Sequence, residues 1–378
     1  MKVVFGQTTL AMTQTSTAPP RVLMIGAHRT KTLGGITTLI EALLQSSLTQ
    51  EFEVHHLPTQ ADEYGGIGKI GLAIAAWCQF VCRIFWWKPE IVYIHVGANL
   101  SIYRKLPFLF AARVLQRKIV THFHAGDFAE YYARQPRFGQ WLIRRGLQQS
   151  DCVLAVSESL QTVLKSFLAR TQIHFIPNGI ALNEFASEAR HNTSTAKAGE
   201  KIVRMLFVGA MGRLKGERDL LRAIQSLSER YPMLRVTLLG HGAETVEEVI
   251  AETGLARLIE HRGPVKLTDR ARFFQEADFF VLPSYAEGMP ISIIEAMAAG
   301  LPIIATRIGG IPELVTENHE GWLVEAGDVA ALTERIAFVL DHPQLRSQAG
   351  ANALNRAQQF DLAQVIQQLG TVFHQMRR

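Results

Sequence analysis

The chain has 378 residues, of which 48% are hydrophobic and 19% are charged, and its formal net charge is +5 at pH 7. At ~150 residues per domain, this length favours two domains, each able to bury a core of ordinary size. The composition excludes a disordered chain and a low-complexity scaffold.

Residues 1–20 precede the first apolar run, and we expect them to form a flexible tail. They contain Thr, Ser and Pro rather than the apolar core of a signal peptide, so we expect a cytoplasmic protein. The first apolar run, Arg21–Gly26, is typical of a buried parallel strand. A polar loop that ends in Gly34 and Gly35 follows it, and the pattern over 36–44 is then helical.

The most apolar stretch lies between Lys69 and Arg83 and has thirteen uncharged residues, fewer than the ~18–20 that a membrane-spanning helix needs. It contains Cys78 and Cys82, which are four residues apart in a helical pattern without a histidine or acidic partner in step. Burial in a core is therefore favoured over a metal site. With Cys152 the chain has three cysteines, too few for a disulfide framework, which is typical of a reducing compartment.

Short apolar runs alternate with helical patterns along the rest of the chain. Strands are predicted at 91–95, 118–122 and 152–156 in the first half, and at 205–208, 235–239, 279–282 and 302–305 in the second. Such alternation favours parallel sheets with helices on both faces. The stretch 183–200 between the two series is polar, small and aperiodic, as expected of a linker.

The expected fold class is therefore α/β, with two doubly wound Rossmann-like domains that face each other across a cleft. In such sheets ligands bind at the ends of the strands. We expect the first domain over 21–182 and the second over 201–360. A C-terminal helix over 361–378 is expected to pack back on the first domain.

The most informative segment of the chain runs from Ala277 to Glu313. A predicted strand ends there, a loop carries Glu287 and Gly288, and Pro290 suits the first turn of a helix. Free backbone N–H groups at that helix start, with a glycine that allows close approach, form an anion site suited to a diphosphate.

Two glutamates flank this anion site. Glu295 is about one turn into the helix, and side chains lean toward a helix's N-terminus, so its carboxylate can accept hydrogen bonds from ribose hydroxyls at the mouth. Glu287 would then lie beyond the phosphates, where a sugar would sit. The alternative is two solvated glutamates, but Gly288 and the Gly309-Gly310 loop after the next strand argue against it.

This segment resembles the retaining glycosyltransferases of family 4, which have the GT-B fold. Glu287 and Glu295 match that family's pair of glutamates separated by seven residues, and the resemblance extends over residues 21–375. It implies a hexosyl- or N-acetylhexosaminyl-transferase that moves a sugar from a nucleotide diphosphate sugar to an acceptor hydroxyl with retention. The first domain would then be the acceptor side, and the second would bind the nucleotide sugar.

Four further segments agree with the family's pattern. Gly34-Gly35-Ile36 resembles its glycine loop near the donor phosphates, and 122–127 resembles the segment whose histidine contacts the donor sugar. Ile176–Gly179 looks like its hinge-side turn, and Lys215 with Gly216 matches its phosphate-contacting lysine. The resemblance implies catalytic roles for Glu287, His124 and Lys215, donor binding by Gly34, Gly35, Arg213, Lys215, Gly288, Met289, Pro290 and Glu295, and acceptor or sugar contacts by His122 and Asp127.

One departure from the family concerns the diphosphate clamp. The family has an arginine directly after the glycine of the Phe-Val-Gly strand end, whereas this chain has Ala210. Arg213, three residues on, either supplies the missing cation or is a surface arginine. The two histidines have a similar alternative, because a histidine that follows an apolar strand is more often packed than catalytic.

The mechanism that the resemblance implies needs no metal and no separate base. Negative charge develops on the leaving phosphate, which Lys215 and the helix start near Gly288 can stabilise. In the family this phosphate is thought to accept the acceptor's proton. The chain has no Asp-x-Asp pair, so we expect no metal ion and no cofactor. Family frequency alone favours UDP over GDP as the donor nucleotide.

Other functions remain open at this point. A sugar-nucleotide epimerase or a phosphorylase could use the same architecture. The epimerase would need further acid and base carboxylates, and the phosphorylase would need a cofactor lysine. A bilobal sugar-binding protein without chemistry is a third alternative, although such proteins are usually exported.

Charge is distributed unevenly between the two halves. Residues 21–182 contain 17 Lys and Arg against 10 Asp and Glu, whereas residues 201–360 contain 17 against 20. The excess is concentrated in 101–145, where nine basic residues are interleaved with aromatic ones. They are Arg104, Lys105, Arg113, Arg117, Lys118, Arg134, Arg137, Arg144 and Arg145, with Tyr103, Phe108, Phe110, Phe138 and Trp141.

Basic residues with aromatic neighbours suit a surface that lies on anionic lipid, although an ordinary solvated face is the alternative. Nucleic acid is a poorer partner, because nothing resembles a groove-reading element and the second half is acidic. We therefore expect peripheral association with the inner face of the plasma membrane, a polyprenyl-diphosphate-linked acceptor, and a role in making a cell-surface polysaccharide or glycolipid.

Overall fold

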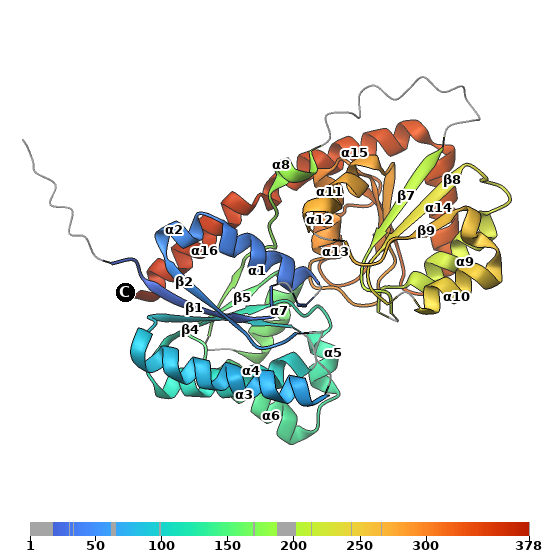
Figure 1. The fold of residues 1–378 in the computed structure, drawn as a ribbon. Coiled ribbons are helices and arrows are strands. Elements are labelled where there is room, and N and C mark those ends of the chain that lie inside the picture. Colours follow the sequence, from blue (N-terminus) through green and yellow to red (C-terminus); the bar gives the residue numbers. More distant parts are fainter. Residues whose placement is uncertain are drawn as a thin grey trace, which may run out of the picture.

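The chain folds into two α/β halves that lie side by side (Figure 1). The structure is a computed structural model. It describes residues 18–29, 31–32, 34–61, 66–97, 100–168, 171–186, 202–212, 214–242, 244–265 and 267–377. The predicted tail falls almost wholly outside these residues, and so do most of the predicted linker and Arg213.

The N-terminal half contains a parallel six-stranded sheet with the strand order β2-β1-β3-β4-β5-β6. Its strands are β1 (Arg21–Gly26), β2 (Glu53–Pro58), β3 (Ile91–Val96), β4 (Lys118–Phe123), β5 (Cys152–Ala155) and β6 (Gln172–Phe175). Four of these agree with the predicted strands, and the two edge strands, β2 and β6, were not predicted. The strand order reverses between β1 and β3, where loops of such sheets form a ligand-binding crevice.

Helices cover both faces of this first sheet, with α1 on one face and α3, α4 and α6 on the other (Figure 1). The helices are α1 (Gly35–Gln45), α2 (Leu48–Glu51), α3 (Gly66–Cys82), α4 (Leu100–Val114), α5 (Phe128–Ala133), α6 (Arg137–Leu147) and α7 (Glu158–Phe167), and a π-helical turn (Arg83–Trp87) continues α3.

The C-terminal half contains a second parallel six-stranded sheet with the order β12-β11-β10-β7-β8-β9. Its strands are β7 (Val203–Val208), β8 (Leu234–Leu239), β9 (Ile259–His261), β10 (Phe279–Leu282), β11 (Ile303–Thr306) and β12 (Gly321–Val324). This is the order of a dinucleotide-binding sheet, with its switch point between β7 and β10. The edge strands β9 and β12 were again not predicted.

The remaining helices belong to the second half or connect the two halves. They are α8 (Leu182–Phe185), α9 (Glu217–Leu227), α10 (Glu244–Thr253), α11 (Leu267–Glu276), α12 (Ile291–Ala298), α13 (Ile311–Leu314), α14 (Val329–Asp341), α15 (Pro343–Ala357) and α16 (Leu362–Arg377), with short 3-10 turns at Leu255–Arg257 and Gln358–Phe360. The short helix α8 forms where the linker was expected to begin.

The C-terminal helix α16 leaves the second half and packs on the first (Figure 1). Its Phe373 meets Phe52 and Tyr93 edge to face, with ring centroids 5.4 and 5.2 Å apart. At the crossing, Leu362 donates to the carbonyl of Ile180 and Ile180 donates to that of Phe360. The chain therefore passes between the halves twice at one place, beside the Ile176–Gly179 turn.

The predicted burial of Cys78 and Cys82 is wrong, because both are exposed on α3. The helix also continues through Arg83, so the segment Ile70–Trp87 has 18 residues and is long and apolar enough to cross a membrane, by length and composition only. Only 17% of this segment is buried. The sequence-based length of thirteen residues was too short, because it ended at Arg83, which the helix includes.

The basic and aromatic residues of 101–145 are divided between the core and the surface. Lys105 is buried beside Thr59, and burial lowers the pKa of its ammonium to about 7. Arg113 and Arg117 donate to main-chain carbonyls, and Phe108 is buried. The expectation of one continuous basic face is therefore wrong for these four residues. The exposed members are Arg104, Lys118, Arg134, Arg137, Arg144 and Arg145, with Phe138 and Trp141.

Candidate active site at the junction of the two halves

An ion pair lies at the switch point of the second sheet, where the loops after β7 and β10 meet. The Nζ of Lys215 lies 2.5 Å from Oε1 of Glu287, and the hydroxyl of Ser284 donates to the same oxygen at 2.8 Å. Glu287 is 9% exposed. The sequence predicted both charged residues, and the fold brings them together although they are 72 positions apart.

Gly216 makes this approach of the two loops possible. Its φ is +70°, which side chains other than glycine rarely adopt, and a β-carbon there would overlap the carbonyl oxygen of Pro283. The glycine after Lys215 therefore allows the main chain after β7 to lie against the loop that leads to Glu287.

The loop after β4, in the first half, rests directly on the loop of Glu287. A β-carbon on Gly126 would overlap the carbonyl oxygen of Glu287, and one on Gly288 would overlap that of His124. The amide of Gly310 donates to the carbonyl of Gly288 at 2.8 Å. Glycines on both sides thus allow main chain from the two halves to touch, and this contact brings the main chain of His124 against the loop that carries Glu287.

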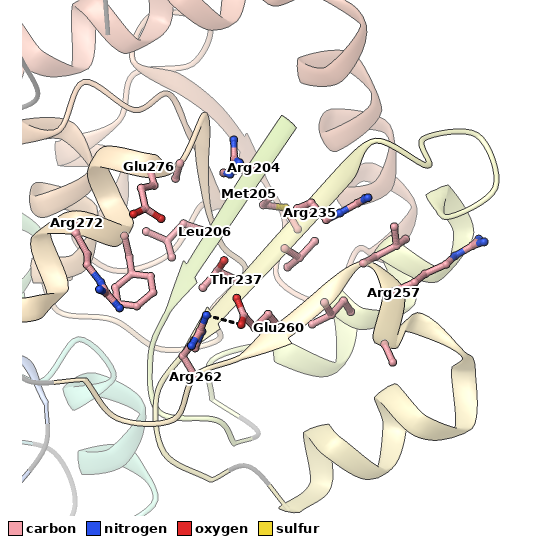
Figure 2. A pocket seen from close by; sticks show the side chains of 16 residues that line it. Arg204, Met205, Leu206, Arg235, Thr237, Arg257, Glu260, Arg262, Arg272 and Glu276 are labelled. Carbon is pink, nitrogen blue, oxygen red and sulfur yellow. Dashed lines mark ion pairs between the residues drawn. The ribbon is translucent and has the colours of Figure 1, made fainter. Parts of the chain in front are cut away.

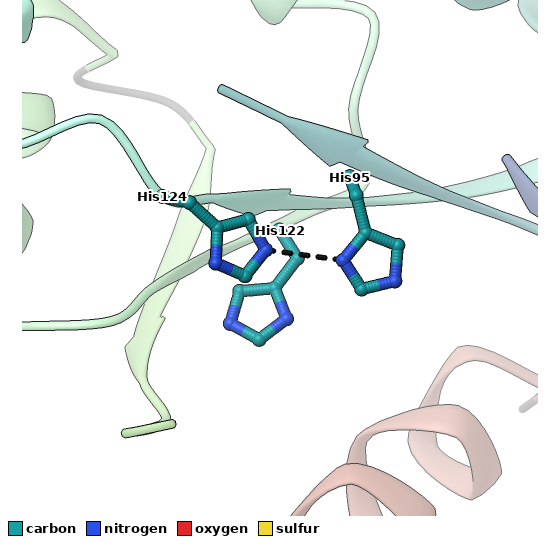
Figure 3. Close-up of side chains that lie close together, drawn as sticks. All are labelled: His95, His122 and His124. Carbon is teal, nitrogen blue, oxygen red and sulfur yellow. Dashed lines mark hydrogen bonds between the residues drawn. The ribbon is translucent and has the colours of Figure 1, made fainter. Parts of the chain in front are cut away.

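Three histidines form a cluster at the ends of β3 and β4 (Figure 3). Nδ1 of His95 and Nε2 of His124 are 3.0 Å apart and share a hydrogen bond, and Nδ1 of His122 bonds to the hydroxyl of Tyr93 at 2.6 Å. His95 was not singled out from the sequence. His95 ends a predicted strand, as His122 does, and the two residues are paired in register on β3 and β4. That position at the end of a strand was the signal from which His95 could have been found.

Burial lowers the pKa of all three histidines, to about 3 in the case of His122. The neighbouring histidines lower those of His95 and His124 further. All three rings are therefore neutral at pH 7, and they can accept and donate hydrogen bonds. One nitrogen from each lies within 4.8 Å of the others, and neutral imidazoles are metal ligands, so these residues can hold a metal ion by geometry.

The buried histidines predict a loss of stability in mild acid. The folded-state pKa of His122 is about 3 and its ordinary value is 6.5, so the unfolded chain binds the additional proton between these two values. As the pH is lowered well below 6.5, each such histidine should therefore decrease the free energy of unfolding by about 1.4 kcal/mol for every pH unit. Denaturant unfolding at pH 7.5 and 5.5 measures this, and His122→Asn should show a shallower slope. An equal slope in the variant would exclude His122 as a cause.

The sequence predicted that the carboxylate of Glu295 lies open at the mouth of α12, but the structure places it elsewhere. It is fully buried and forms an ion pair with Arg270 of α11. Burial raises the pKa of its carboxyl group, and the guanidinium of Arg270 opposes that effect. Its Oε1 and the Nε of Arg270 have no hydrogen-bond partner among the described residues. Arg270 was not predicted, because only the tertiary fold brings α11 beside α12.

Two further contacts join the halves around the site. Both carboxylate oxygens of Glu313 accept bonds from the first amides of α7, those of Glu158 and Ser159, at 2.7 and 2.9 Å. A carboxylate is favourable at a helix N-terminus. The side-chain amide of Asn178 donates to the carbonyl of Met289 at 2.7 Å. These contacts hold α13 and the start of α12 against the first half.

The remaining predicted residues surround the same junction. Gly34 has φ +143° at the start of α1, and a β-carbon there would meet nothing within 4 Å. A β-carbon on Gly35 would contact Ile291 at 3.7 Å, so the starts of α1 and α12 are neighbours. Pro290 directly precedes α12. Met289 is buried, and Asp127 is half-buried just before α5.

A cavity of about 440 Å³ lies elsewhere in the second half, against β7, β8 and β9 (Figure 2). Its lining includes five arginines: Arg204, Arg235, Arg257, Arg262 and Arg272. Arg262 is paired with Glu260 at 2.6 Å. None of the predicted site residues that the structure describes lines this cavity, so it is separate from the junction.

Two sequence families match the chain. Residues 37–184 match Glycosyltransferase Family 4, and residues 188–356 match Glycosyl transferases group 1. A D-inositol 3-phosphate glycosyltransferase of Corynebacterium diphtheriae is 27% identical over 84% of this chain and 75% of its own length. The amylovoran biosynthesis glycosyltransferase AmsK of Erwinia amylovora is 29% identical over 64% of this chain and 59% of its own length.

The alignments to six other D-inositol 3-phosphate glycosyltransferases cover 36% to 60% of those proteins. Among solved structures, the sucrose-phosphate synthase of Thermosynechococcus elongatus has a TM-score of 0.76 at 20% identity, over 94% of this chain and 99% of that one. Anabaena HepE in complex with UDP-glucose has a TM-score of 0.71 at 18% identity, over 94% and 99%. The predicted two-domain GT-B fold is confirmed.

Proposed function

We propose that this chain, which belongs to glycosyltransferase family 4, transfers a hexosyl or N-acetylhexosaminyl group from a nucleotide diphosphate sugar to an acceptor hydroxyl with retention. The observation that carries the proposal is the junction at which the Lys215–Glu287 pair of one half meets the His124 loop of the other. Charged groups for a donor and a neutral histidine thus converge at the carboxyl ends of both sheets.

The donor would bind with its diphosphate between Lys215 and the start of α12. The Lys215 ammonium has three N–H donors and can bond to Glu287 and to a phosphate oxygen together. Negative charge that develops on the leaving phosphate would be stabilised there. Glu287 would orient the sugar or stabilise positive charge on its ring. UDP is the favoured nucleotide, because HepE, a protein of similar fold, binds UDP-glucose.

His124 would contact the donor sugar or the acceptor as a neutral ring. Because burial lowers its pKa well below 6.5, it does not supply a proton as an imidazolium at pH 7. It can accept a hydrogen bond from a sugar hydroxyl while His95 fixes its orientation at 3.0 Å. The leaving phosphate would then take the proton of the acceptor, and no separate base is needed.

Glu295 is fully buried beside Arg270, so the nucleotide would have to open the contact between α11 and α12 for Oε1 to accept a bond from a ribose hydroxyl. Replacing Glu295 with alanine should then weaken nucleotide binding by ~1–3 kcal/mol. The change also leaves Arg270 without its carboxylate, so the melting temperature should fall. Glu295→Gln keeps an acceptor and serves as the control. Titration of UDP into each folded variant measures the affinity, and an unchanged affinity in Glu295→Ala would remove Glu295 from the site.

Transfer should not require a divalent metal. The cationic Lys215 and the helix start near Gly288 would provide the charge stabilisation that a metal supplies in other enzymes. Turnover should therefore be retained in excess EDTA. Loss of turnover that magnesium, manganese or zinc restores would contradict this and point to the three histidines as ligands.

The acceptor would be a glycan on a polyprenyl diphosphate, used to build a cell-surface polysaccharide or glycolipid. The relative AmsK is a glycosyltransferase of amylovoran biosynthesis, which supports this class of product. The protein would work in the cytoplasm on the inner face of the plasma membrane. The exposed arginines of α6 with Phe138 and Trp141 would contact anionic lipid there.

One experiment tests the proposed activity. A panel of UDP- and GDP-sugars is screened first by thermal shift, since a bound ligand raises the melting temperature by mass action. Sugars that bind are then incubated with the enzyme, and released nucleotide is measured with and without a lipid-linked acceptor. A transferase should release nucleotide faster with acceptor, whereas a binding protein releases none.

A further inference from the structure

The surface of α3 and of the π-helical turn after it carries large apolar side chains in contact with solvent. The exposed fractions are 62% for Ile70, 60% for Ile74, 39% for Trp77, 57% for Phe85 and 80% for Trp86. The opposite side of the same helix contributes Ala76, Phe80 and Ile84 to the core. The segment is therefore apolar on both sides, although the core covers only one.

The exposed residues form a stripe and are not scattered. Ile70, Ile74 and Trp77 are spaced i, i+4 and i+7, which places them on one helical face. A surface helix of a soluble protein normally presents polar residues on that face. Between Ile70 and Trp87 the one charged residue is Arg83, and its guanidinium donates to the carbonyl of His56. A contiguous apolar surface of this kind marks an interaction site.

A second exposed apolar group lies on α6, in the same layer of helices (Figure 1). Phe138 and Trp141 are 70% and 58% exposed, and their rings stack with centroids 5.8 Å apart. Arg137, Arg144 and Arg145 are exposed on the same face of α6. This helix therefore combines apolar rings with cations, as helices at membrane surfaces do.

The helix α4 connects α3 and α6 into one layer. The ring of Phe108 on α4 packs against Trp77 of α3, with centroids 5.6 Å apart. On the other side, Gly146 of α6 lies close enough to Leu106 of α4 that a β-carbon would overlap it. The apolar stripe of α3 and the cationic face of α6 thus belong to one side of the first sheet.

The charge of this layer indicates what kind of partner covers it. Among the described residues of 66–150, seven basic side chains are exposed, Lys88, Arg104, Lys118, Arg134, Arg137, Arg144 and Arg145, against two exposed acidic ones, Glu90 and Glu130. A second copy of the chain would bring two such basic surfaces together, which like charges disfavour. An anionic lipid surface complements them. Four of the five tryptophans, Trp77, Trp86, Trp87 and Trp141, lie here, and tryptophan is enriched at membrane interfaces.

We propose that α3 and its π-helical turn insert into the interface of an anionic bilayer, with the Ile70–Ile74–Trp77 stripe and Trp86 among the acyl chains. The helix lies in the membrane plane and does not span it, because Ala76, Phe80 and Ile84 hold it to the sheet. This inference rests on the proposed membrane association. It adds that apolar side chains of α3 anchor the protein in the bilayer, in addition to the electrostatic contact made by α6.

Vesicle flotation of the full chain tests the insertion. The probes are vesicles of phosphatidylcholine alone and with phosphatidylglycerol, at low and high salt. The wild type should bind the anionic vesicles and keep part of that binding at high salt, because salt screens charges but not apolar contacts. Ile74→Ser with Trp86→Ser should lower binding about tenfold or more at both salt concentrations.

Two other variants separate this inference from the membrane association itself. Arg144→Ser with Arg145→Ser should lose binding mainly at low salt. Leu345→Ser with Leu354→Ser removes apolar residues that are 42% and 41% exposed on α15 and should bind as the wild type does. If the arginine variant loses binding while Ile74→Ser with Trp86→Ser binds normally, insertion by α3 is excluded and the electrostatic contact stands. If the wild type binds neither vesicle at low salt, both proposals fail.

Tryptophan fluorescence gives a second measurement that does not depend on activity. Trp322 is 3% exposed, so lipid should affect mainly the four tryptophans of the α3 and α6 layer. Bromine on the acyl chains should quench the wild type, and the α3 variant should be quenched much less. Lack of acyl-chain quenching would overturn the insertion. Light scattering in the absence of lipid gives the oligomeric state. If the wild type is a dimer and the α3 variant is a monomer, the stripe is a protein interface and the insertion is overturned. An unchanged melting shift with UDP confirms that each variant is folded.

Discussion

Replacing Lys215 with alanine is expected to lower turnover by about 100-fold or more. The ammonium lies 2.5 Å from Glu287 at the switch point of the second sheet, where it would stabilise the leaving phosphate. Removal of one charge stabiliser at a developing anion costs ~10²–10³ in turnover. Nucleotide release at saturating donor sugar measures the effect, with binding of UDP measured separately. The loss should fall on turnover more than on UDP affinity.

Variants of Lys215 and of its partner Glu287, alone and together, are the controls for this prediction. Lys215→Arg keeps the charge, whereas Glu287→Ala removes the carboxylate and should also lower turnover. Because the two groups share one hydrogen bond, the double variant should lose much less than the product of the single losses. If Lys215→Ala turns over like the wild type, the pair only holds the two loops together. The melting temperature of each variant excludes simple unfolding.

The central strands of both sheets could be predicted from the sequence, but the edge strands could not. Runs such as Ile91–Val96 and Phe279–Leu282 are buried on both faces and are therefore continuously apolar. The edge strand β2 has the sequence Glu-Val-His-His-Leu-Pro, and β9 has only three residues. Edge strands are partly solvated, so they lack that signal.

The site residues that the sequence predicted belong to short motifs, and those it missed depend on the tertiary fold. Lys215 and Glu287 each follow a predicted strand, and carboxyl ends of parallel strands share one edge of a sheet. By contrast, Arg270 and Glu313 act through contacts with Glu295 and with the start of α7. No local pattern fixes which helix faces another, so neither contact could be predicted.

The same limit explains the errors on α3. An apolar helical pattern predicts that Cys78 and Cys82 are buried, because in most soluble proteins such a face meets a core. Here one side of the helix packs on the sheet and the cysteines lie on the exposed side. The pattern gives the apolar character of the helix, but it does not say which of its faces the core covers.

Gly126→Ala is expected to lower turnover by about 100-fold or more without weakening UDP binding. A β-carbon at position 126 would overlap the carbonyl oxygen of Glu287, so the His124 loop and the Glu287 loop must move apart. A displacement of about 1 Å between catalytic groups can cost ~10² in rate. The donor nucleotide would bind the second half, so its affinity should remain within a factor of about two.

The matched control for this change is Gly71→Ala, because a β-carbon on Gly71 meets nothing within 4 Å. Its turnover and melting temperature should equal those of the wild type or exceed them slightly, since alanine is the better helix former. If Gly126→Ala weakens UDP binding as much as turnover, the two loops would form part of the nucleotide site itself. That outcome would contradict the assignment of His124 to the sugar side, because Gly126 and His124 belong to the same loop after β4. If Gly126→Ala changes neither turnover nor UDP affinity, the contact between the halves would not limit the reaction, and sugar transfer would need a different arrangement of the two halves.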